Sequence, residues 1–132
     1  MSAANVDLVR SALEAYNSGD LDALVAIAHP ELEYRPAGIW PGLKAVYRGP
    51  GGVWEFWRDF AETWESVIND IEDLRAQDDR VVALFTIQAR GRDGIEVRRQ
   101  LATIFTTRNG LVFRMTSYAS WDEALQAAGA DD

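Results

Sequence analysis

The 132-residue sequence contains no cysteine, one histidine and one lysine, and each scarcity excludes some chemistry. Without cysteine the chain forms no disulfide and has no thiolate for catalysis or metal binding. With one histidine, carboxylates are almost the only metal ligands left, so we expect no metal and no other cofactor. No apolar run approaches the ~20 residues of a membrane-spanning helix, and the N-terminus lacks the pattern of a signal peptide. We therefore expect a cytoplasmic protein.

The composition is that of a folded, acidic protein. Apolar residues make up 48% of the chain, and the five tryptophans argue against disorder. The net charge is -8, with a pI near 4.6, so neither nucleic acid nor a membrane is an expected partner. Residues 1–132 suit one domain. Twelve arginines against the single Lys44 are typical of a GC-rich bacterial genome.

The first half of the sequence has mainly helical periodicity. Apolar residues recur at helical spacing after Asn5, an expected N-cap, and again at 21–28, after the stop signal Gly19 and the expected cap Asp20. A third apolar stripe predicts a helix over 53–64. Residues 32–35 form a short strand candidate, and the glycine- and proline-rich residues 37–52 form a loop.

The second half is predicted to be a meander of long strands. Apolar and β-branched runs cover 67–76, 81–90, 95–108 and 111–119, separated by Asp78-Asp79, Asp93-Gly94 and Asn109-Gly110. A short helix follows at 121–128. The expected class is α+β: a cone-shaped, strongly curved, mixed or antiparallel sheet wrapped by about three N-terminal helices.

Two signals disagree about which strand residues face the helices. A two-residue loop at Asn109-Gly110 places Ile104 beside Met115, and an even-numbered loop at Asp93-Gly94 adds the alternate residues of strand 81–90. The resulting concave face comprises Ala83, Phe85, Ile87, Gln100, Ala102, Ile104, Met115, Ser117 and Ala119. Periodicity in strand 95–108 alone favours the opposite face, through Ile95, Val97, Leu101 and Phe105. We interpret the pairing as decisive and expect a homodimer through the face with Leu101, Phe105, Thr116 and Tyr118.

A ligand pocket follows from the same arrangement. Polar residues expected inside are Arg35, Arg98, Gln100 and Ser117, beside the apolar Phe85, Ile87 and Met115. A buried pair in which Glu33 or Glu96 neutralises an arginine is equally consistent with the sequence. For Trp40 and Tyr47, on the loop, covering a ligand and simple packing are both open, whereas Trp57 also fits a helix core stripe.

Several motifs resemble a known superfamily. These are the sequences at 17–24, 29–31 and 49–53, together with 46–50 and the C-terminal 121–129. Together they resemble the nuclear transport factor 2 fold and, within it, the SnoaL-like polyketide-cyclase group. The resemblance implies the cone fold, often as a dimer. It leaves the function open, because this fold hosts isomerases, dehydratases, epoxide hydrolases, cyclases and non-catalytic binders.

The catalytic residues of the known branches are missing. Ketosteroid isomerases of this fold use an aspartate base and two oxyanion donors, and the matching positions here are Arg35, Ala12 and Ala102. Epoxide-hydrolase-like sites surround an arginine with aspartates, whereas this chain has Gln100 after its arginines. Cyclases of the group rely on an aspartate and a histidine, and no histidine falls on a predicted strand. Catalytic residues therefore stay unassigned.

Two further motifs favour structural interpretations. His29 precedes Pro30 at a predicted helix end, where an imidazole meets free carbonyls more often than it acts as a base. The glycines of 49–52 lack the Lys-Ser/Thr of a phosphate loop and suit a loop-to-helix connection.

Three functions remain open on the sequence. One is an enzyme of cyclase, isomerase or hydrolase type acting on a hydrophobic carbonyl- or carboxylate-bearing compound. The second is a non-catalytic binder of a small hydrophobic ligand. The third is a dimeric interaction domain whose cavity is filled by its own side chains.

Overall fold

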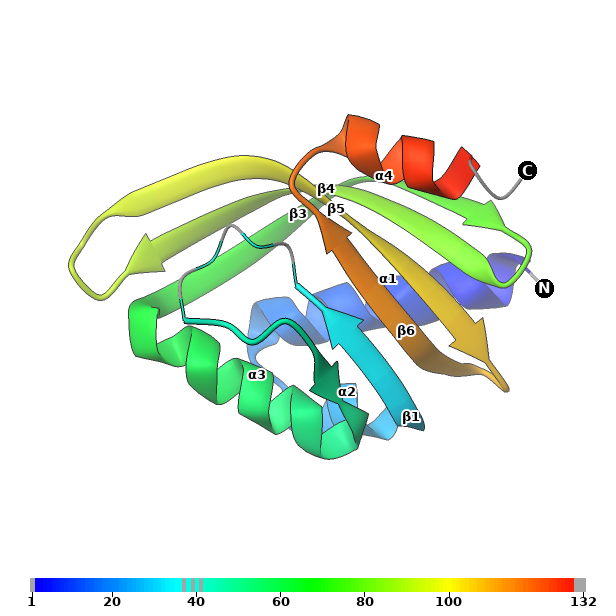
Figure 1. Ribbon diagram of the computed structural model, residues 1–132, viewed down its shortest axis with the longest axis horizontal. Coiled ribbons are helices and arrows are strands. Elements are labelled where there is room, and N and C mark those ends of the chain that lie inside the picture. The colour runs from blue at the N-terminus through cyan, green and yellow to red at the C-terminus, as the bar shows by residue number, and fades with distance from the viewer. Residues whose placement is uncertain (1, 37, 39, 41, 130–132) are drawn as a thin grey trace.

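A six-stranded sheet with helices on both sides makes up the computed structural model, which describes residues 2–36, 38, 40 and 42–129 (Figure 1). The helices are α1 Ser2–Ser18, α2 Leu21–Ala26, α3 Gly49–Thr63 and α4 Trp121–Gly129. The strands are β1 Ala28–Arg35, β2 Tyr47–Arg48, β3 Trp64–Gln77, β4 Arg80–Gly91, β5 Glu96–Arg108 and β6 Leu111–Tyr118. Their order in the sheet is β2-β1-β6-β5-β4-β3, with β1 and β6 parallel and the other neighbouring pairs antiparallel.

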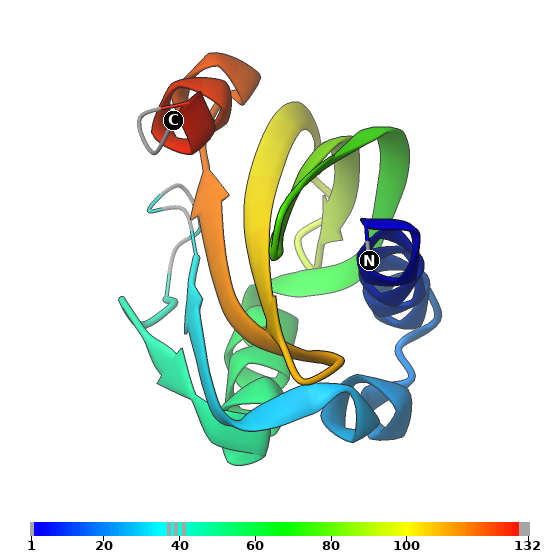
Figure 2. The ribbon, with the colours of Figure 1, turned by 90° about the vertical axis from the view of Figure 1, so that its right-hand side faces the viewer.

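The predicted α+β class, the mixed sheet and the three N-terminal helices are confirmed. Helices α1 and α3 lie against one side of the sheet, here called the inner face, and α4 lies against the outer face (Figure 2). The sheet bends around α1 and α3 without being strongly curled, so the predicted strong curvature is not confirmed. No helix in the described part of the chain is long and apolar enough to cross a membrane.

The first two helices follow the sequence signals with one exception. Asp20 caps α2, because its carboxylate accepts a hydrogen bond from the Ala23 amide at 3.1 Å, and Gly19 has a left-handed φ of 70°. The predicted cap at Asn5 is wrong. Asn5 lies inside α1, and its side-chain amide donates to the Asp78 carbonyl at 3.3 Å.

Strand β1 begins earlier than predicted, and α2 is shorter. The chain leaves α2 after Ala26 and is already extended at Ala28, two residues before Pro30. Pro30 has no N–H to donate to a neighbouring strand, and it lies between Ala28 and Glu33, where the pairing of β1 with β6 shifts register. His29 therefore lies on a strand, contrary to the prediction. Its Nδ1 accepts a hydrogen bond from the Glu31 amide at 2.9 Å, and its ring meets the Phe113 edge. These contacts are structural, but the predicted helix end at His29 and its predicted contact with free carbonyls are wrong.

The hairpin of β5 and β6 contains a bulge that the sequence did not reveal. Asn109 and Gly110 have φ values of 54° and 76°, and Arg108 pairs with Leu111 as predicted. Beyond the turn, however, Thr107 pairs with Val112 and Thr106 with Arg114, so Phe113 is an extra residue. The bulge moves every later partner by one, and Met115 lies opposite Phe105 instead of Ile104.

The pairing of β4 with β5 is also shifted by one residue from the prediction. The Gly91 amide donates to the Ile95 carbonyl at 2.7 Å, which closes a loop of three residues instead of two or four. Phe85 then lies opposite Leu101, and Ile87 opposite Arg99. A shift of one residue in the pairing of two strands exchanges the two faces of one strand relative to the other. Both pairings of β5 are shifted by one residue, so β5 is turned over relative to the prediction.

The inner face therefore carries Leu101 and Phe105, two of the four residues that the periodicity of β5 favoured, whereas Ile95 precedes β5 and is exposed. Leu101 and Phe105 are buried under α1, together with Val81, Ala83 and Phe85. The predicted concave face was wrong in its β5 members, and Leu101 and Phe105 cannot form a dimer surface.

The outer face has its own cover. Val82, Leu84, Ala102 and Ile104 pack under α4, and the Trp121 indole N–H donates to the Leu101 carbonyl at 2.9 Å. The chain itself thus covers part of the surface that the sequence assigned to a partner copy.

Candidate functional site

An internal cavity lies between α1, α3 and the inner face of the sheet. Its free volume is about 60 Å³, counted as space open to the centre of a water-sized sphere. One water needs about 10–15 Å³ on this measure, so several waters or a small organic molecule fit. The aromatic residues that line it are Tyr16, Tyr34, Trp40, Phe56, Trp57, Phe60, Phe85 and Phe105. We call this space the aromatic cavity.

Stacked and edge-on rings form the wall of the aromatic cavity on the α3 side. Phe56 and Phe60 lie one helical turn apart, and their centroids are 5.6 Å from each other. Tyr34 from β1 packs edge to face with Phe56, with 4.9 Å between the ring centroids, and Trp40 does so with Phe60, at 5.7 Å. Such contacts fix the rings, so the cavity keeps an apolar wall with a defined shape.

Hydroxyl groups gather on the strand side of the aromatic cavity. Thr103 and Ser117 face each other on β5 and β6, and their hydroxyl oxygens are 2.8 Å apart. The Tyr34 hydroxyl lies within hydrogen-bonding reach of Ser117. Burial raises the pKa of Tyr34 to about 12, so its hydroxyl stays protonated at neutral pH and can donate a hydrogen bond.

Two more polar residues line the aromatic cavity. Burial raises the pKa of Tyr16 well above its ordinary value, with a further rise from the neighbouring Tyr34 hydroxyl. Asn69 on β3 is held by the side chain of Asn17 of α1. The Asn69 backbone N–H donates to Asn17 Oδ1 at 2.6 Å, and Asn17 Nδ2 donates to the Asn69 backbone carbonyl at 3.0 Å. This pair anchors the C-terminal end of α1 to the sheet beside the cavity.

The lining of the aromatic cavity is uncharged. Among the residues that the structure describes, no aspartate, glutamate, histidine, lysine or arginine lines it. No group of three or more potential ligands in the described chain could hold a metal ion. The described lining thus offers neutral hydrogen-bond donors and acceptors but no acid or base that titrates near neutral pH.

The buried tyrosines make the stability of the fold depend on alkaline pH. Below the ordinary tyrosine pKa of 10, both folded and unfolded chains keep the Tyr34 proton. Between pH 10 and about 12, only the folded chain keeps it, so stability falls as pH rises, by roughly 2–3 kcal/mol for this residue. Urea denaturation across this range should show the fall, and Tyr34→Phe should make it smaller. An unchanged pH dependence in Tyr34→Phe would contradict the assignment.

Six of the ten predicted ligand-binding residues line the aromatic cavity. They are Trp40, Trp57, Phe85, Ile87, Met115 and Ser117. Tyr47 lines a separate, smaller space of about 20 Å³. The Tyr47 hydroxyl is already engaged, since it accepts from the Lys44 amide at 2.9 Å and donates to Asp59 at 2.7 Å.

The three remaining predicted residues lie outside the aromatic cavity. Arg98 and Gln100 are exposed on the outer face, because the two hairpins turn β5 over, so their predicted position was wrong. Arg35 is half-exposed and bonds Glu33 at 3.3 Å, so the partner named in the alternative is present but the pair is not buried. Glu96 pairs with Arg90 instead of Arg98.

Sequence reasoning missed four polar residues of the site. Tyr16 was assigned only to a helix stripe, and Tyr34, Asn69 and Thr103 were not singled out. The periodicity of β5 was the available signal for Thr103, because Thr103 shares a face with Leu101 and Phe105. No pattern in the sequence indicated the contact of Asn69 with α1.

The fold places this chain in a class with many solved members. An NTF2-like protein of unknown function from Burkholderia pseudomallei superposes with a TM-score of 0.82 at 21% identity, over 93% of this chain and 95% of that one. TerC, crystallised with polyporic acid, superposes with a TM-score of 0.81 at 20% identity, over 93% of this chain and 96% of TerC. A candidate polyketide cyclase from Xanthomonas campestris superposes with a TM-score of 0.80 at 20% identity, over 92% of this chain and 94% of that one. These likenesses establish the NTF2-like fold.

The family is established by sequence. The model of the SnoaL-like domain matches residues 9–115, so the chain belongs to the SnoaL-like family. No curated protein matches it. The resemblance predicted from the motifs is confirmed.

Proposed function

We propose that this protein binds a small molecule whose uncharged, largely apolar, carbonyl-bearing part lies in the aromatic cavity. The observation that carries the proposal is the uncharged lining, in which the hydroxyls of Tyr34, Ser117 and Thr103 meet on an otherwise apolar wall. A carbonyl oxygen accepts hydrogen bonds from such groups, and the aromatic wall covers the rest of the molecule. A charged group would be costly in this position, because no described lining residue neutralises it.

The relatives agree with a small-molecule role. TerC was crystallised with polyporic acid, and a protein of ketosteroid isomerase-like fold from Catenulispora acidiphila with trimethylamine. The aromatic cavity is also not filled by its own side chains, which favours binding over a purely structural domain. The homodimer remains a prediction, and of the four residues first assigned to its interface only Thr116 and Tyr118 lie on the outer face.

A matched ligand pair tests the proposal. Acetophenone and isopropylbenzene have nearly the same shape, but only the ketone accepts a hydrogen bond. One hydrogen bond is worth about 0.5–1.5 kcal/mol net, so we expect the ketone to bind about 2- to 12-fold more tightly by calorimetric titration. Tyr34→Phe should remove most of this preference while leaving the affinity for isopropylbenzene unchanged. Tyr118→Phe, on the outer face of β6, is the control and should change neither affinity.

Two results would count against the proposal. If neither compound binds at millimolar concentration, the cavity does not hold ligands of this size. If isopropylbenzene binds as tightly as acetophenone, the hydroxyls do not meet the ligand.

An enzyme of cyclase, isomerase or hydrolase type is the second candidate. It is favoured by one observation, namely that the Tyr34 hydroxyl lies in the cavity with the paired Ser117 and Thr103 hydroxyls and could donate a hydrogen bond to an oxyanion. Because the described lining supplies no base, we expect the protein not to accelerate hydrogen–deuterium exchange at the methyl group of acetophenone. Exchange that is fast and lost in Tyr34→Phe would favour the enzyme over the binder.

A further inference from the structure

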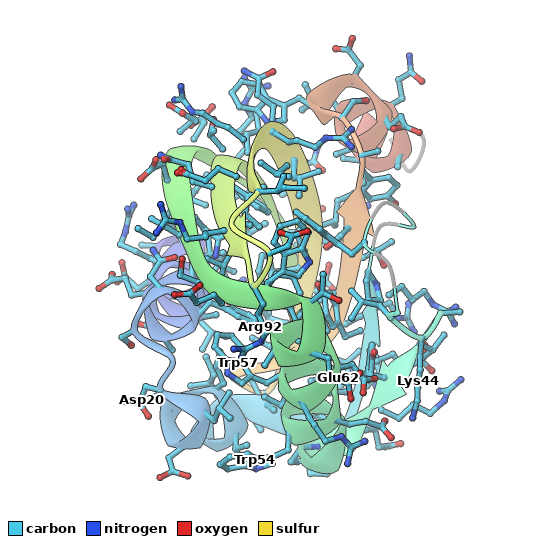
Figure 3. The ribbon with its side chains drawn as sticks, turned by 90° about the vertical axis from the view of Figure 1, so that its left-hand side faces the viewer. Asp20, Lys44, Trp54, Trp57, Glu62 and Arg92 are labelled. Carbon is cyan, nitrogen blue, oxygen red and sulfur yellow. The ribbon has the colours of Figure 1, made fainter. Side chains whose placement is uncertain are left out.

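An open groove lies directly outside the aromatic cavity. It runs between the end of α1, the C-terminal half of α3 and the start of β3. Tyr16, Trp57, Phe60 and Val67 line both the groove and the cavity, so these side chains separate the two spaces. In Figure 3 this side of the molecule is turned towards the viewer. Trp57 and Arg92 are labelled next to each other, with α1 and α2 on the left and α3 on the right. A ligand long enough to pass between these side chains would have its inner end in the cavity and its outer end in the groove.

Arg92 is the only cationic side chain in the described lining of the groove. It lies in the loop between β4 and β5, and two bonds to α3 hold it there. Its backbone amide donates to the Thr63 carbonyl at 3.0 Å, and its Nε donates to the Ala61 carbonyl at 2.5 Å. Arg92 makes no ion pair with any described carboxylate, so the terminal N–H groups of its guanidinium remain available.

A second unused donor lies in the same groove. Trp64, the C-cap of α3, lines the groove, and its indole N–H is buried without a hydrogen-bond partner among the described residues. Unpaired buried donors are rare in folded proteins and call for an explanation. The free N–H groups of Arg92 favour a ligand group that only accepts, and a carboxylate is such a group. The exposed Glu65 is the only anionic residue in the described lining and would weaken such binding.

We propose that the ligand carries a carboxylate on its outer end, bound by Arg92 in the groove, while its uncharged carbonyl part lies in the aromatic cavity. This inference rests on the function proposed above and adds the charge and the orientation of the ligand. The sequence predicted that Arg98 binds the polar group of the ligand, and this inference assigns that role to Arg92 in the neighbouring loop. The uncharged cavity and the Arg92 side chain in the groove then select an amphipathic acid, with its apolar end inside.

The test compares acids with an uncharged analogue. The probes are 4-acetylbenzoate and its homologues with one or two methylenes before the carboxylate, which vary the reach to Arg92. The reference is 4-methylacetophenone. We expect at least one acid to bind at least about fivefold more tightly than the reference at low salt, and less so at high salt.

Variants assign the effect to Arg92. Arg92→Gln should remove the preference for the acid and leave binding of 4-methylacetophenone unchanged, which also shows that the variant is folded. Arg90→Gln makes the same charge change on the same hairpin, outside the groove, and should have little effect. Glu65→Gln should strengthen acid binding about twofold.

Each other outcome has a defined meaning. If the ketone binds but no acid is preferred, or if Arg92→Gln keeps the preference, the inference is overturned and the proposed function stands. If neither the ketone nor any acid binds, both are overturned.

Discussion

Leu101→Glu is expected to unfold the protein, whereas Gln100→Glu on the neighbouring position should leave its stability unchanged. Leu101 is 3% exposed beneath α1, and a carboxylate there would be buried without a partner. We expect a loss of more than about 4 kcal/mol, comparable with the whole stability of a small domain. Gln100 is exposed on the outer face, where a substitution typically changes stability by less than about 0.5 kcal/mol.

Urea denaturation followed by circular dichroism measures both variants. The pair tests the register of β5 directly, because the two positions point to opposite faces. A folded Leu101→Glu beside an unfolded Gln100→Glu would mean that β5 is turned the other way.

Ser117→Phe is expected to abolish ligand binding by filling the aromatic cavity. Ser117 lines the cavity beside Thr103 and Met115, and a benzyl group there occupies the space that acetophenone needs. Inserting a large side chain into a packed region costs about 1–3 kcal/mol, so the variant should still fold. We expect its affinity for acetophenone to fall at least about 100-fold, which is beyond what the loss of one hydrogen bond explains.

Thr116→Phe is the matched control for this substitution. Thr116 precedes Ser117 on β6 and faces the opposite side of the sheet. Binding of acetophenone by Thr116→Phe should equal that of the wild type. If Ser117→Phe still binds acetophenone with wild-type affinity, the ligand lies elsewhere.

The sequence predicted the elements of this fold much better than the contacts between them. Dipeptides such as Asn109-Gly110 mark a turn because few residues accept left-handed φ angles, and this signal is local. The bulge at Phe113 and the three-residue loop after Gly91 depend on how whole strands pack, and no local signal indicated either. One residue in each hairpin was enough to exchange the faces of β5.

The apolar periodicity of β5 was the more reliable signal for its faces. Burial acts on every second residue of a strand, and Leu101 and Phe105 both indicate the inner face. The pairing argument rested on loop lengths alone, and a single miscounted residue reverses it. Where the two signals conflict, the hydrophobic pattern reflects the larger free energy and should decide.

The same error explains which parts of the candidate site were predictable. Phe85, Ile87, Met115 and Ser117 were placed correctly because β4 and β6 kept their faces. Arg98 and Gln100 lie on the outer face because β5 is turned over relative to the prediction. Arg92 could not be recognised from the sequence, since its position depends on the contact of the β4–β5 loop with the end of α3.

A crystal structure of the protein with acetophenone tests the central claim most directly. The account predicts ligand density in the aromatic cavity, with the carbonyl oxygen within hydrogen-bonding distance of the Tyr34 or Ser117 hydroxyl and the ring against Phe56 and Phe60. Density only on the outer face of the sheet, or a carbonyl oxygen turned towards the apolar wall, would contradict it.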